Sequence, residues 1–145
     1  MQAVYNKQKV LFVCTGNSCR SQMAEGMLMH YGKDKFEVFS AELEPSYVHP
    51  LAIKAMAESG IDLTGQHSKT VNELLEEEFS YVITVCDSAK ERCPVFPGKY
   101  NAIHWSIEDP ASAEGTETER MKDFRIVRQD IRERINHFIS VLCEE

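Results

Sequence analysis

Apolar and polar residues follow two different patterns along this chain, and each pattern predicts a different kind of element. Consecutive apolar, often β-branched residues fill Lys9–Cys14 and Ser80–Cys86, as expected for strands that are buried on both faces of a sheet. Phe36–Glu42 and Asn101–Ser106 also favour strands. Elsewhere the apolar residues recur every three or four positions, which is typical of helices that bury one side.

The helical pattern is clearest in three places. Ser21–Gly32 carries its large apolar residues at helical spacing and ends on a glycine suited to a C-terminal cap. His49–Gly60 has Pro50 in its first turn and another glycine at its end. A long C-terminal helix has an apolar face made of Phe124, Val127, Ile131, Ile135, Phe138 and Leu142.

Less regular stretches lie between these elements. Val71–Phe79 predicts a further helix with Thr70 as its N-cap, and Asp87–Arg92 can begin another. The polar segment Glu108–Phe124 contains the longest predicted loop. Strands that alternate with helices indicate a single α/β domain over residues 1–145, with a parallel sheet covered by helices on both faces.

Open sheets of this kind bind ligands outside the carboxyl ends of their strands. Cys14 and Cys86 each end a predicted strand, and Asp109 lies just beyond another. We therefore expect these three residues to belong to one site.

The charge and the apolar content of the chain exclude some kinds of partner for this protein. The formal net charge is −7, which argues against nucleic-acid and anionic-membrane partners, because both need a basic surface. The apolar run Val10–Cys14 is too short to cross a bilayer, and the first nine residues lack the apolar core of a signal peptide. We therefore expect a cytoplasmic monomer without membrane contact.

The chain has five cysteines, and an odd number without an export signal indicates thiol chemistry or metal binding rather than a structural disulfide set. We expect Cys19 and Cys143 to be packing residues and Trp105 to lie in the core. The histidines that we expect to cap helices or lie in loops, rather than act as a base, are His49, His67 and His104.

The segment Cys14–Ser21 joins a buried strand to a helix, so several backbone N–H groups converge where the helix dipole also favours negative charge. Gly16 permits a close backbone approach, and Arg20 adds a planar fork for two oxygens of a phosphate-like ion. The same field should lower the pKa of Cys14 by roughly two units, and Ser21 can hydrogen-bond its sulfur. We therefore predict that Cys14 is a thiolate nucleophile toward a tetrahedral oxyanion.

The chain contains its own control for this interpretation. Cys86 and Arg92 have the same spacing as the first cysteine–arginine pair. However, that segment has no glycine, Asp87 and Glu91 would repel an anion, and Cys93 rather than a hydroxyl follows the arginine. We therefore reject it as a second anion loop.

Three motifs carry a resemblance to a known family: CTGNSCRSQMAEG from Cys14, VCDSAKERCP around Cys86 and Cys93, and HWSIEDPA from His104. In order and approximate spacing, over essentially the whole chain, they resemble the low-molecular-weight protein tyrosine phosphatase fold and its thioredoxin-coupled arsenate reductase branch. The resemblance implies a four-stranded parallel sheet of strand order 2-1-3-4, with arsenate as the substrate.

The resemblance also implies roles at the matching positions. Cys14 would attack arsenate, and Asp109 would act as general acid for the departing hydroxyl, with Pro110 biasing the aspartate backbone toward an extended conformation. Besides Arg20, the groups implied to hold the substrate oxygens are the backbone amides of Thr15, Gly16, Asn17, Ser18, Cys19, Arg20 and Ser21.

Reduction of arsenate to arsenite takes two electrons, which one dithiol supplies when it becomes a disulfide. Cys86 can attack the sulfur of a Cys14–arsenic adduct and release arsenite, and Cys93 can then move the disulfide to Cys86–Cys93. Reduced thioredoxin is the expected electron donor, and no tightly bound cofactor or metal is expected. A helix between Cys86 and Cys93 would hold them roughly 10 Å apart, beyond the limit of about 7 Å for a disulfide, so we predict that this segment unwinds on oxidation.

Some members of the family bind a monovalent cation beneath the anion loop through Asn, Glu, Ser and Asp. Asn17, Glu25 and Ser40 match the first three positions, and Lys69 stands at the fourth. An ammonium group there could supply the charge internally, so we predict no potassium requirement.

Two other functions fit parts of the sequence. A protein tyrosine phosphatase of the same fold would use Cys14, Arg20 and Asp109, but it would leave the later cysteine pair unexplained, and Ala111 stands where such phosphatases usually carry an aromatic residue. Weak phosphatase activity is still expected, because the loop cannot separate phosphate from arsenate by shape. A zinc or redox-sensing module fits poorly, because structural zinc sites usually contain a close cysteine pair.

Overall fold

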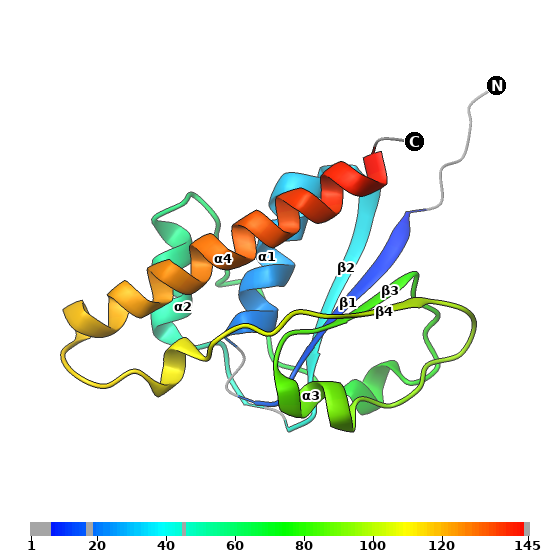
Figure 1. Cartoon of the computed structure of the whole chain (residues 1–145), viewed down its shortest axis with the longest axis horizontal. Helices are drawn as coiled ribbons and strands as arrows, with labels where there is room; N and C mark the ends of the chain where they lie inside the picture. Colours follow the sequence, from blue (N-terminus) through cyan, green and yellow to red (C-terminus); the bar gives the residue numbers. More distant parts are fainter. Residues whose placement is uncertain (1–6, 17–18, 45, 144–145) are drawn as a thin grey trace.

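Four parallel strands form one sheet in the computed structural model, which describes residues 7–16, 19–44 and 46–143 (Figure 1). The strand order β2-β1-β3-β4 is the order that the resemblance implied. The strands are β1 (Gln8–Cys14), β2 (Phe36–Glu42), β3 (Tyr81–Thr84) and β4 (Asn101–His104).

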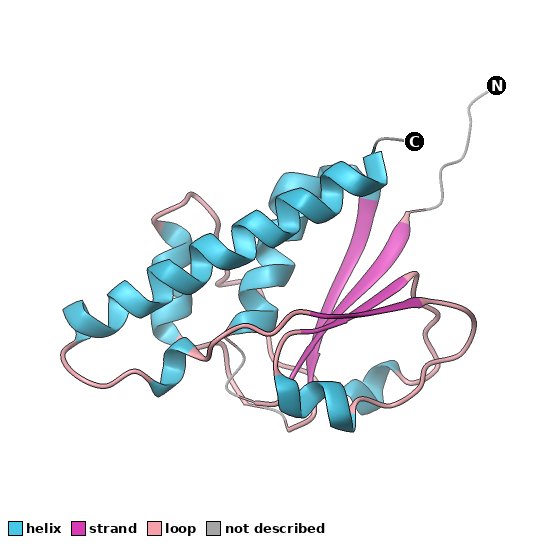
Figure 2. Cartoon of the chain, viewed as in Figure 1, coloured by secondary structure: helices cyan, strands magenta, loops and turns pink. Residues whose placement is uncertain are grey.

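The helices cover both faces of this sheet, as predicted. They are α1 (Arg20–Gly32), α2 (Pro50–Ala57), α3 (Asp87–Arg92) and α4 (Glu117–Cys143), with short 3₁₀ helices at Lys33–Lys35, Val71–Leu74 and Pro110–Ser112. Figures 1 and 2 show α1, α2 and α4 gathered on one side of the sheet and α3 on the other. Within the described residues, no helix is both long and apolar enough to cross a membrane.

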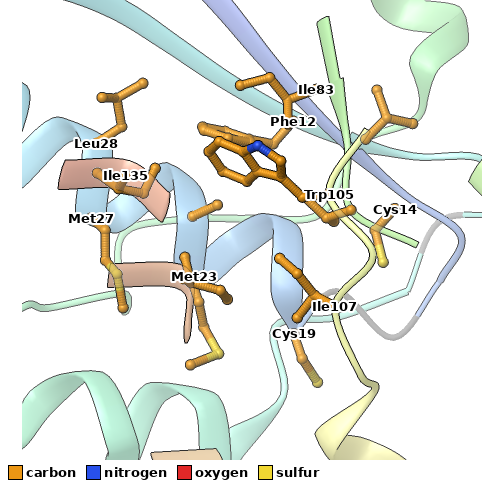
Figure 3. Packing of buried hydrophobic residues seen from close by; sticks show 14 of the residues in the cluster. Phe12, Cys14, Cys19, Met23, Met27, Leu28, Ile83, Trp105, Ile107 and Ile135 are labelled. Carbon is orange, nitrogen blue, oxygen red and sulfur yellow. The ribbon is translucent and has the colours of Figure 1, made fainter. Parts of the chain in front are cut away.

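The core is built around β1, which lies between β2 and β3. Val10–Val13 is completely buried, as expected for a strand that is covered on both faces. Figure 3 shows the rings of Phe12 and Trp105 side by side, with their centroids 5.9 Å apart, and Cys14 at the margin where β1 ends. The same packing that stabilises the sheet therefore fixes the position of Cys14.

The apolar face predicted for the C-terminal helix is confirmed. Phe124, Val127, Ile131, Ile135 and Phe138 are buried in the core. The helix packs against α1 and α2, so its apolar face is covered by other helices as well as by the sheet.

The loop predicted within Glu108–Phe124 ends where α4 starts. The helix already begins at Glu117, because the hydroxyl of Thr116 accepts from the N–H of Glu119 (3.2 Å) and the Glu119 carboxylate accepts from the N–H of Thr116 (3.4 Å). This reciprocal pair is a capping box, which overrides the low apolar content of the first two turns.

The helix predicted over Val71–Phe79 is shorter than predicted. Only a 3₁₀ helix forms, and it ends at Leu74. The residue before it, Thr70, has extended backbone, and its N–H donates to the Glu73 carboxylate at 2.9 Å. Three consecutive glutamates follow, and Glu77 forms an ion pair with Lys9, which favours an irregular path back to the sheet.

Gly32 does not have the conformation of a C-terminal cap. The positive φ of 52° belongs to Lys33, and Gly32 remains in the helix. A Cβ at this glycine would lie 2.6 Å from the ring of Phe36, so the glycine is needed for close packing rather than for its backbone angles. Gly60, in contrast, has the predicted positive φ (78°) after α2.

Candidate active site

The carboxyl ends of β1 and β3 bring Cys14 and Cys86 together. Val13 lies opposite Thr84 in the parallel register, and the N–H of Val85 donates to the carbonyl of Val13 at 3.0 Å. Each cysteine follows one of these paired segments, so both side chains leave the sheet at the same edge. Both thiols are buried, and they lie close enough for each to shift the pKa of the other.

Thr15 contacts the second of these sulfurs. Its Oγ1 lies 2.9 Å from Sγ of Cys86, close enough to donate a hydrogen bond to a thiolate. From the sequence, only the backbone amide of Thr15 is expected to take part in the site. The contact joins residues 71 positions apart, so the pairing register of β1 and β3, rather than any local motif, creates it.

The interaction between the two thiols is the main reason why the pKa of Cys86 is lowered to about 5; burial opposes this shift, and the Thr15 hydroxyl adds to it. The same interaction is the main reason why the pKa of Cys14 is raised, and burial raises it further against the opposing charge of Arg20. The pKa of Cys14 therefore shifts in the direction opposite to the predicted lowering. The two thiols titrate as a pair, and the Thr15 hydroxyl, 2.9 Å from the Cys86 sulfur, favours the negative charge on Cys86.

The anion loop is tied to the segment that follows β2. The N–H groups of Leu43 and Glu44 donate to the carbonyls of Cys14 (3.1 Å) and Thr15 (2.9 Å). A Cβ on Gly16 would lie 3.3 Å from the carbonyl oxygen of Glu44, so this glycine serves the close backbone approach that its position predicted. Two predicted substrate-binding positions, Asn17 and Ser18, lie outside the described residues.

Arg20 and Asp109 approach each other at the mouth of this loop. One guanidinium nitrogen of Arg20 donates to the carbonyl of Ile107 at 2.8 Å, and another lies 3.9 Å from the Asp109 carboxylate. Asp109 has extended backbone before Pro110, as predicted, and its carboxylate accepts from the N–H of Ala111 at 2.9 Å. The guanidinium is therefore held at the carboxyl edge of the sheet, next to the predicted general acid.

Ser21 and Cys19 lie deeper in the loop. The hydroxyl of Ser21 is fully buried and has no hydrogen-bond partner among the described residues. The predicted hydrogen bond from Ser21 to the Cys14 sulfur is therefore not formed in this structure. Cys19 is buried, as expected of a packing residue, and burial raises the pKa of its thiol to about 12.

Cys93 lies at the far end of α3 from Cys86. All six residues between the two cysteines are helical, and both thiols are free. Cys93 is half-buried, and burial raises its pKa to about 11. This is the separated, reduced arrangement from which the sequence analysis predicted unwinding.

Three of the four residues compared with a cation site interact with one another. The hydroxyl of Ser40 donates to the buried carboxylate of Glu25. Burial raises the pKa of Glu25, while the hydrogen bond from Ser40 and the positive charge of Lys69 oppose that rise. Asn17, which matches the first position of such a site, lies outside the described part of the chain.

The remaining predictions concern histidines, Trp105 and metals. His49 is the N-cap of α2, where its Nδ1 accepts from the N–H of Leu51 at 3.1 Å, and Trp105 is buried at the end of β4. His67 is exposed. Among the described residues, no group of three or more His, Cys, Asp and Glu side chains could hold a metal ion.

Comparison with known proteins gives consistent similarities. The family model for low molecular weight phosphotyrosine protein phosphatase matches residues 9–145. The arsenate reductase of Halalkalibacterium halodurans is 46% identical over 133 residues, which are 92% of this chain and 96% of that relative. A solved arsenate reductase in its oxidised state is 36% identical, with a TM-score of 0.79 over 92% of this chain and 97% of that one. A thioredoxin-dependent arsenate reductase from Corynebacterium glutamicum is 26% identical, with a TM-score of 0.62 over 92% of this chain and 64% of that one.

Proposed function

The chain belongs to the low-molecular-weight phosphotyrosine protein phosphatase family, and from that premise we propose that it is an arsenate reductase that uses Cys14, Cys86 and Cys93 in turn. The observation that carries the proposal is that the parallel register of β1 and β3 brings the buried thiols of Cys14 and Cys86 to the same edge of the sheet, close enough for each to shift the pKa of the other. A phosphatase of this fold needs one nucleophilic thiol, whereas a reductase needs a second thiol within reach of the first. The similarity to arsenate reductases over most of the chain supports the same activity.

In the first step, arsenate binds against the guanidinium of Arg20 and the amides of the anion loop. The proton of Cys14 passes to the Cys86 thiolate, and the Cys14 thiolate attacks arsenic. Asp109 donates a proton to the departing hydroxyl, which leaves as water. The product is a Cys14–arsenic(V) ester, and no electrons have yet been transferred to arsenic.

In the second step, Cys86 passes its proton to an oxygen of the arsenic ester and attacks the sulfur of Cys14 as a thiolate. The arsenic–sulfur bonding pair stays with arsenic, which falls from the +5 to the +3 state and leaves as arsenite. The Cys14–Cys86 disulfide holds the two oxidised sulfurs. Attack by Cys93 on Cys86 then releases Cys14 as a thiolate and leaves the Cys86–Cys93 disulfide.

Reduced thioredoxin is the proposed electron donor for this last disulfide. The thioredoxin-dependent relative from Corynebacterium glutamicum supports it, as does a relay that ends in an intramolecular disulfide. The net charge of −7 leads us to propose a protein without nucleic-acid partners. We also propose a cytoplasmic monomer with residues 1–145 as one domain.

The test is arsenate-dependent oxidation of NADPH in the presence of thioredoxin and thioredoxin reductase. Wild-type protein should turn over, whereas Cys14→Ser, Cys86→Ser and Cys93→Ser should each lose steady-state turnover. Normal cycling of Cys93→Ser with thioredoxin would contradict the relay. If only Cys14→Ser is inactive, and p-nitrophenyl phosphate is hydrolysed well, the protein is a phosphatase instead.

A further inference from the structure

The side chain of His104 connects the ends of three elements. Its Nδ1 lies 2.8 Å from Oγ1 of Thr84 at the end of β3, and its Nε2 lies 2.9 Å from the carboxylate of Asp87, the first residue of α3. Ser106 also donates to the same carboxylate oxygen, at 3.3 Å. Because a carboxylate only accepts hydrogen bonds, Nε2 carries the proton in this contact. His104 itself ends β4, so it ties the start of α3 to the sheet.

The rest of α3 is also attached to its surroundings. Ala89 is fully buried, and the N–H of Lys90 donates to the carbonyl of Cys86 at 3.2 Å. At the other end, the guanidinium of Arg92 lies 3.7 Å from the carboxylate of Glu44. Figure 1 shows α3 beside the end of the sheet where β1 and β3 finish. The helix is thus held in place beside the thiol pair by contacts at both of its ends.

The relay proposed above requires this arrangement to change. Cys93 must bond to the sulfur of Cys86 while Cys14 leaves as a thiolate, a step in which no net electrons enter or leave the protein. Six helical residues hold the two Cα atoms roughly 10 Å apart, whereas a disulfide needs about 7 Å or less. Cys86 is bonded to Cys14 when Cys93 attacks it, so the unwinding must bring Cys93 to Cys86. Asp87 is the first residue of α3, so unwinding of its turn changes the backbone that sets its carboxylate against His104.

We propose that His104 is a positioning residue that stabilises the helical, reduced form of α3 through Asp87, and that this contact breaks when the Cys86–Cys93 disulfide forms. The inference rests on the proposed relay and adds to it a residue that touches neither arsenate nor a reacting sulfur. It follows that His104 favours the dithiol over the disulfide. Asp87 is 81% exposed, so solvent screening limits the effect to roughly fivefold in the equilibrium constant.

The experiment measures that equilibrium in a Cys14→Ser background, where Cys86 and Cys93 are left as the pair. The protein is equilibrated with mixtures of reduced and oxidised glutathione, and the Cys86–Cys93 disulfide is quantified by alkylation and mass spectrometry. His104→Ala should raise the equilibrium constant for the disulfide roughly fivefold. His104→Gln should restore most of the parent value, because its amide nitrogen can donate to Asp87. The control is His30→Ala, which removes an exposed ring on α1 that contacts Tyr31.

Thermal unfolding of both redox forms separates this role from a purely structural one. His104→Ala should lower the Tm of the dithiol form and leave the Tm of the Cys86–Cys93 form unchanged. If His104→Ala lowers the Tm of both forms equally and leaves the disulfide equilibrium unchanged, the positioning role of His104 is wrong, while the relay is unaffected. If the Cys14→Ser parent forms no Cys86–Cys93 disulfide at all, the relay itself is wrong, and the role of His104 falls with it.

Discussion

Cys14 and Cys86 divide one proton between them, and their surroundings decide which sulfur keeps it. The Thr15 hydroxyl lies against Cys86, so the resting negative charge is on the residue that acts second. Cys14 is then neutral until arsenate is bound, and one proton transfer between two neighbouring sulfurs creates the nucleophile. This order also keeps Cys14 as a less reactive thiol while no substrate is present.

The contribution of Thr15 can be measured by replacing it with valine. Thr15→Val removes a hydrogen bond to the Cys86 thiolate, so the pKa of Cys86 should rise from about 5 by roughly one unit. Thiolate is lost as the pH falls through the pKa. Alkylation of Cys86 by iodoacetamide should therefore be roughly fivefold slower than in wild type near pH 5 and equally fast near pH 8. Thr64→Val, at a threonine bonded only to Asp62, serves as control; overlapping pH profiles for all three proteins would refute the role.

Replacing Arg20 with lysine tests whether the anion loop needs the planar guanidinium group of arginine. Its guanidinium donates to the carbonyl of Ile107 and also lies near Asp109, and the single ammonium of a lysine cannot reproduce both contacts while binding two oxygens. Arg20→Lys should therefore lower kcat/KM for arsenate by about 100-fold or more. Steady-state kinetics measure this, with circular dichroism as the check on folding. A loss smaller than about tenfold would mean that charge alone suffices.

At the scale of elements, α3 is the part that must change. It is six residues long, too short to be stable by itself, and its helical state depends on Ala89 and on the contacts at its two ends. A long, well-packed helix such as α4 would resist unwinding. The shortness of α3 therefore suits a segment that must bring its two flanking cysteines together.

Helix propensity in α3 should consequently shift the disulfide equilibrium. Glu91 is exposed in this helix, where glycine is about 1 kcal/mol less favourable than alanine. Glu91→Gly should favour the Cys86–Cys93 disulfide over the dithiol by roughly fivefold relative to Glu91→Ala. Glutathione equilibration of the two variants gives this ratio directly. Identical ratios would indicate that α3 stays helical when the disulfide forms.

At the scale of the whole molecule, a polar cluster joins segments that are far apart along the chain. The hydroxyl of Ser40 in β2 donates to the buried carboxylate of Glu25 in α1, and the charge of Lys69, from the segment after α2, acts on the same carboxylate. The carbonyl of Lys69 also accepts a hydrogen bond from the N–H of Glu42 at 2.8 Å, which joins this segment to the end of β2.

Removing the lysine charge should make stability depend more strongly on pH. The pKa of Glu25 is raised by burial, so its ionisation opposes folding, and stability falls as the pH rises through its folded-state pKa. Lys69→Met raises that pKa further. The variant should lose about 1.5 kcal/mol relative to wild type at pH 7.5 and much less at pH 4. Urea unfolding at the two pH values measures this, and an equal loss at both would argue against the charge effect.

The prediction that potassium is not required depends on the ammonium group of Lys69 in the same cluster. Wild-type turnover should be the same in potassium and in tetramethylammonium buffers of equal ionic strength. Lys69→Met, which lacks the internal charge, should become potassium-dependent if the lysine stands in for a cation. A strong potassium dependence of the wild type would contradict the interpretation.

Local sequence patterns were sufficient for much of the fold and for part of the site. β2 begins and ends where its apolar run predicted, and the apolar face of α4 is the buried one. The start of α4 was left open within Glu108–Phe124, and the end of the helix at Leu74 was predicted wrongly. Both depend on side-chain hydrogen bonds and ion pairs that apolar periodicity does not detect. The capping box at Thr116 and Glu119 was readable in the sequence, whereas the ion pair between Lys9 and Glu77 joins distant segments.

By itself the sequence determined that a cysteine loop with an arginine follows a buried strand, and that two further cysteines flank a short polar segment, because these features depend on residue type and local spacing. Only the tertiary structure decided which sulfur carries the charge. The parallel register of β1 and β3 sets Cys86 against Cys14 and Thr15, and the neighbouring strand β4 brings His104 to Asp87. Ionisation depends on distances across the sheet, and those distances do not exist until the strands pair.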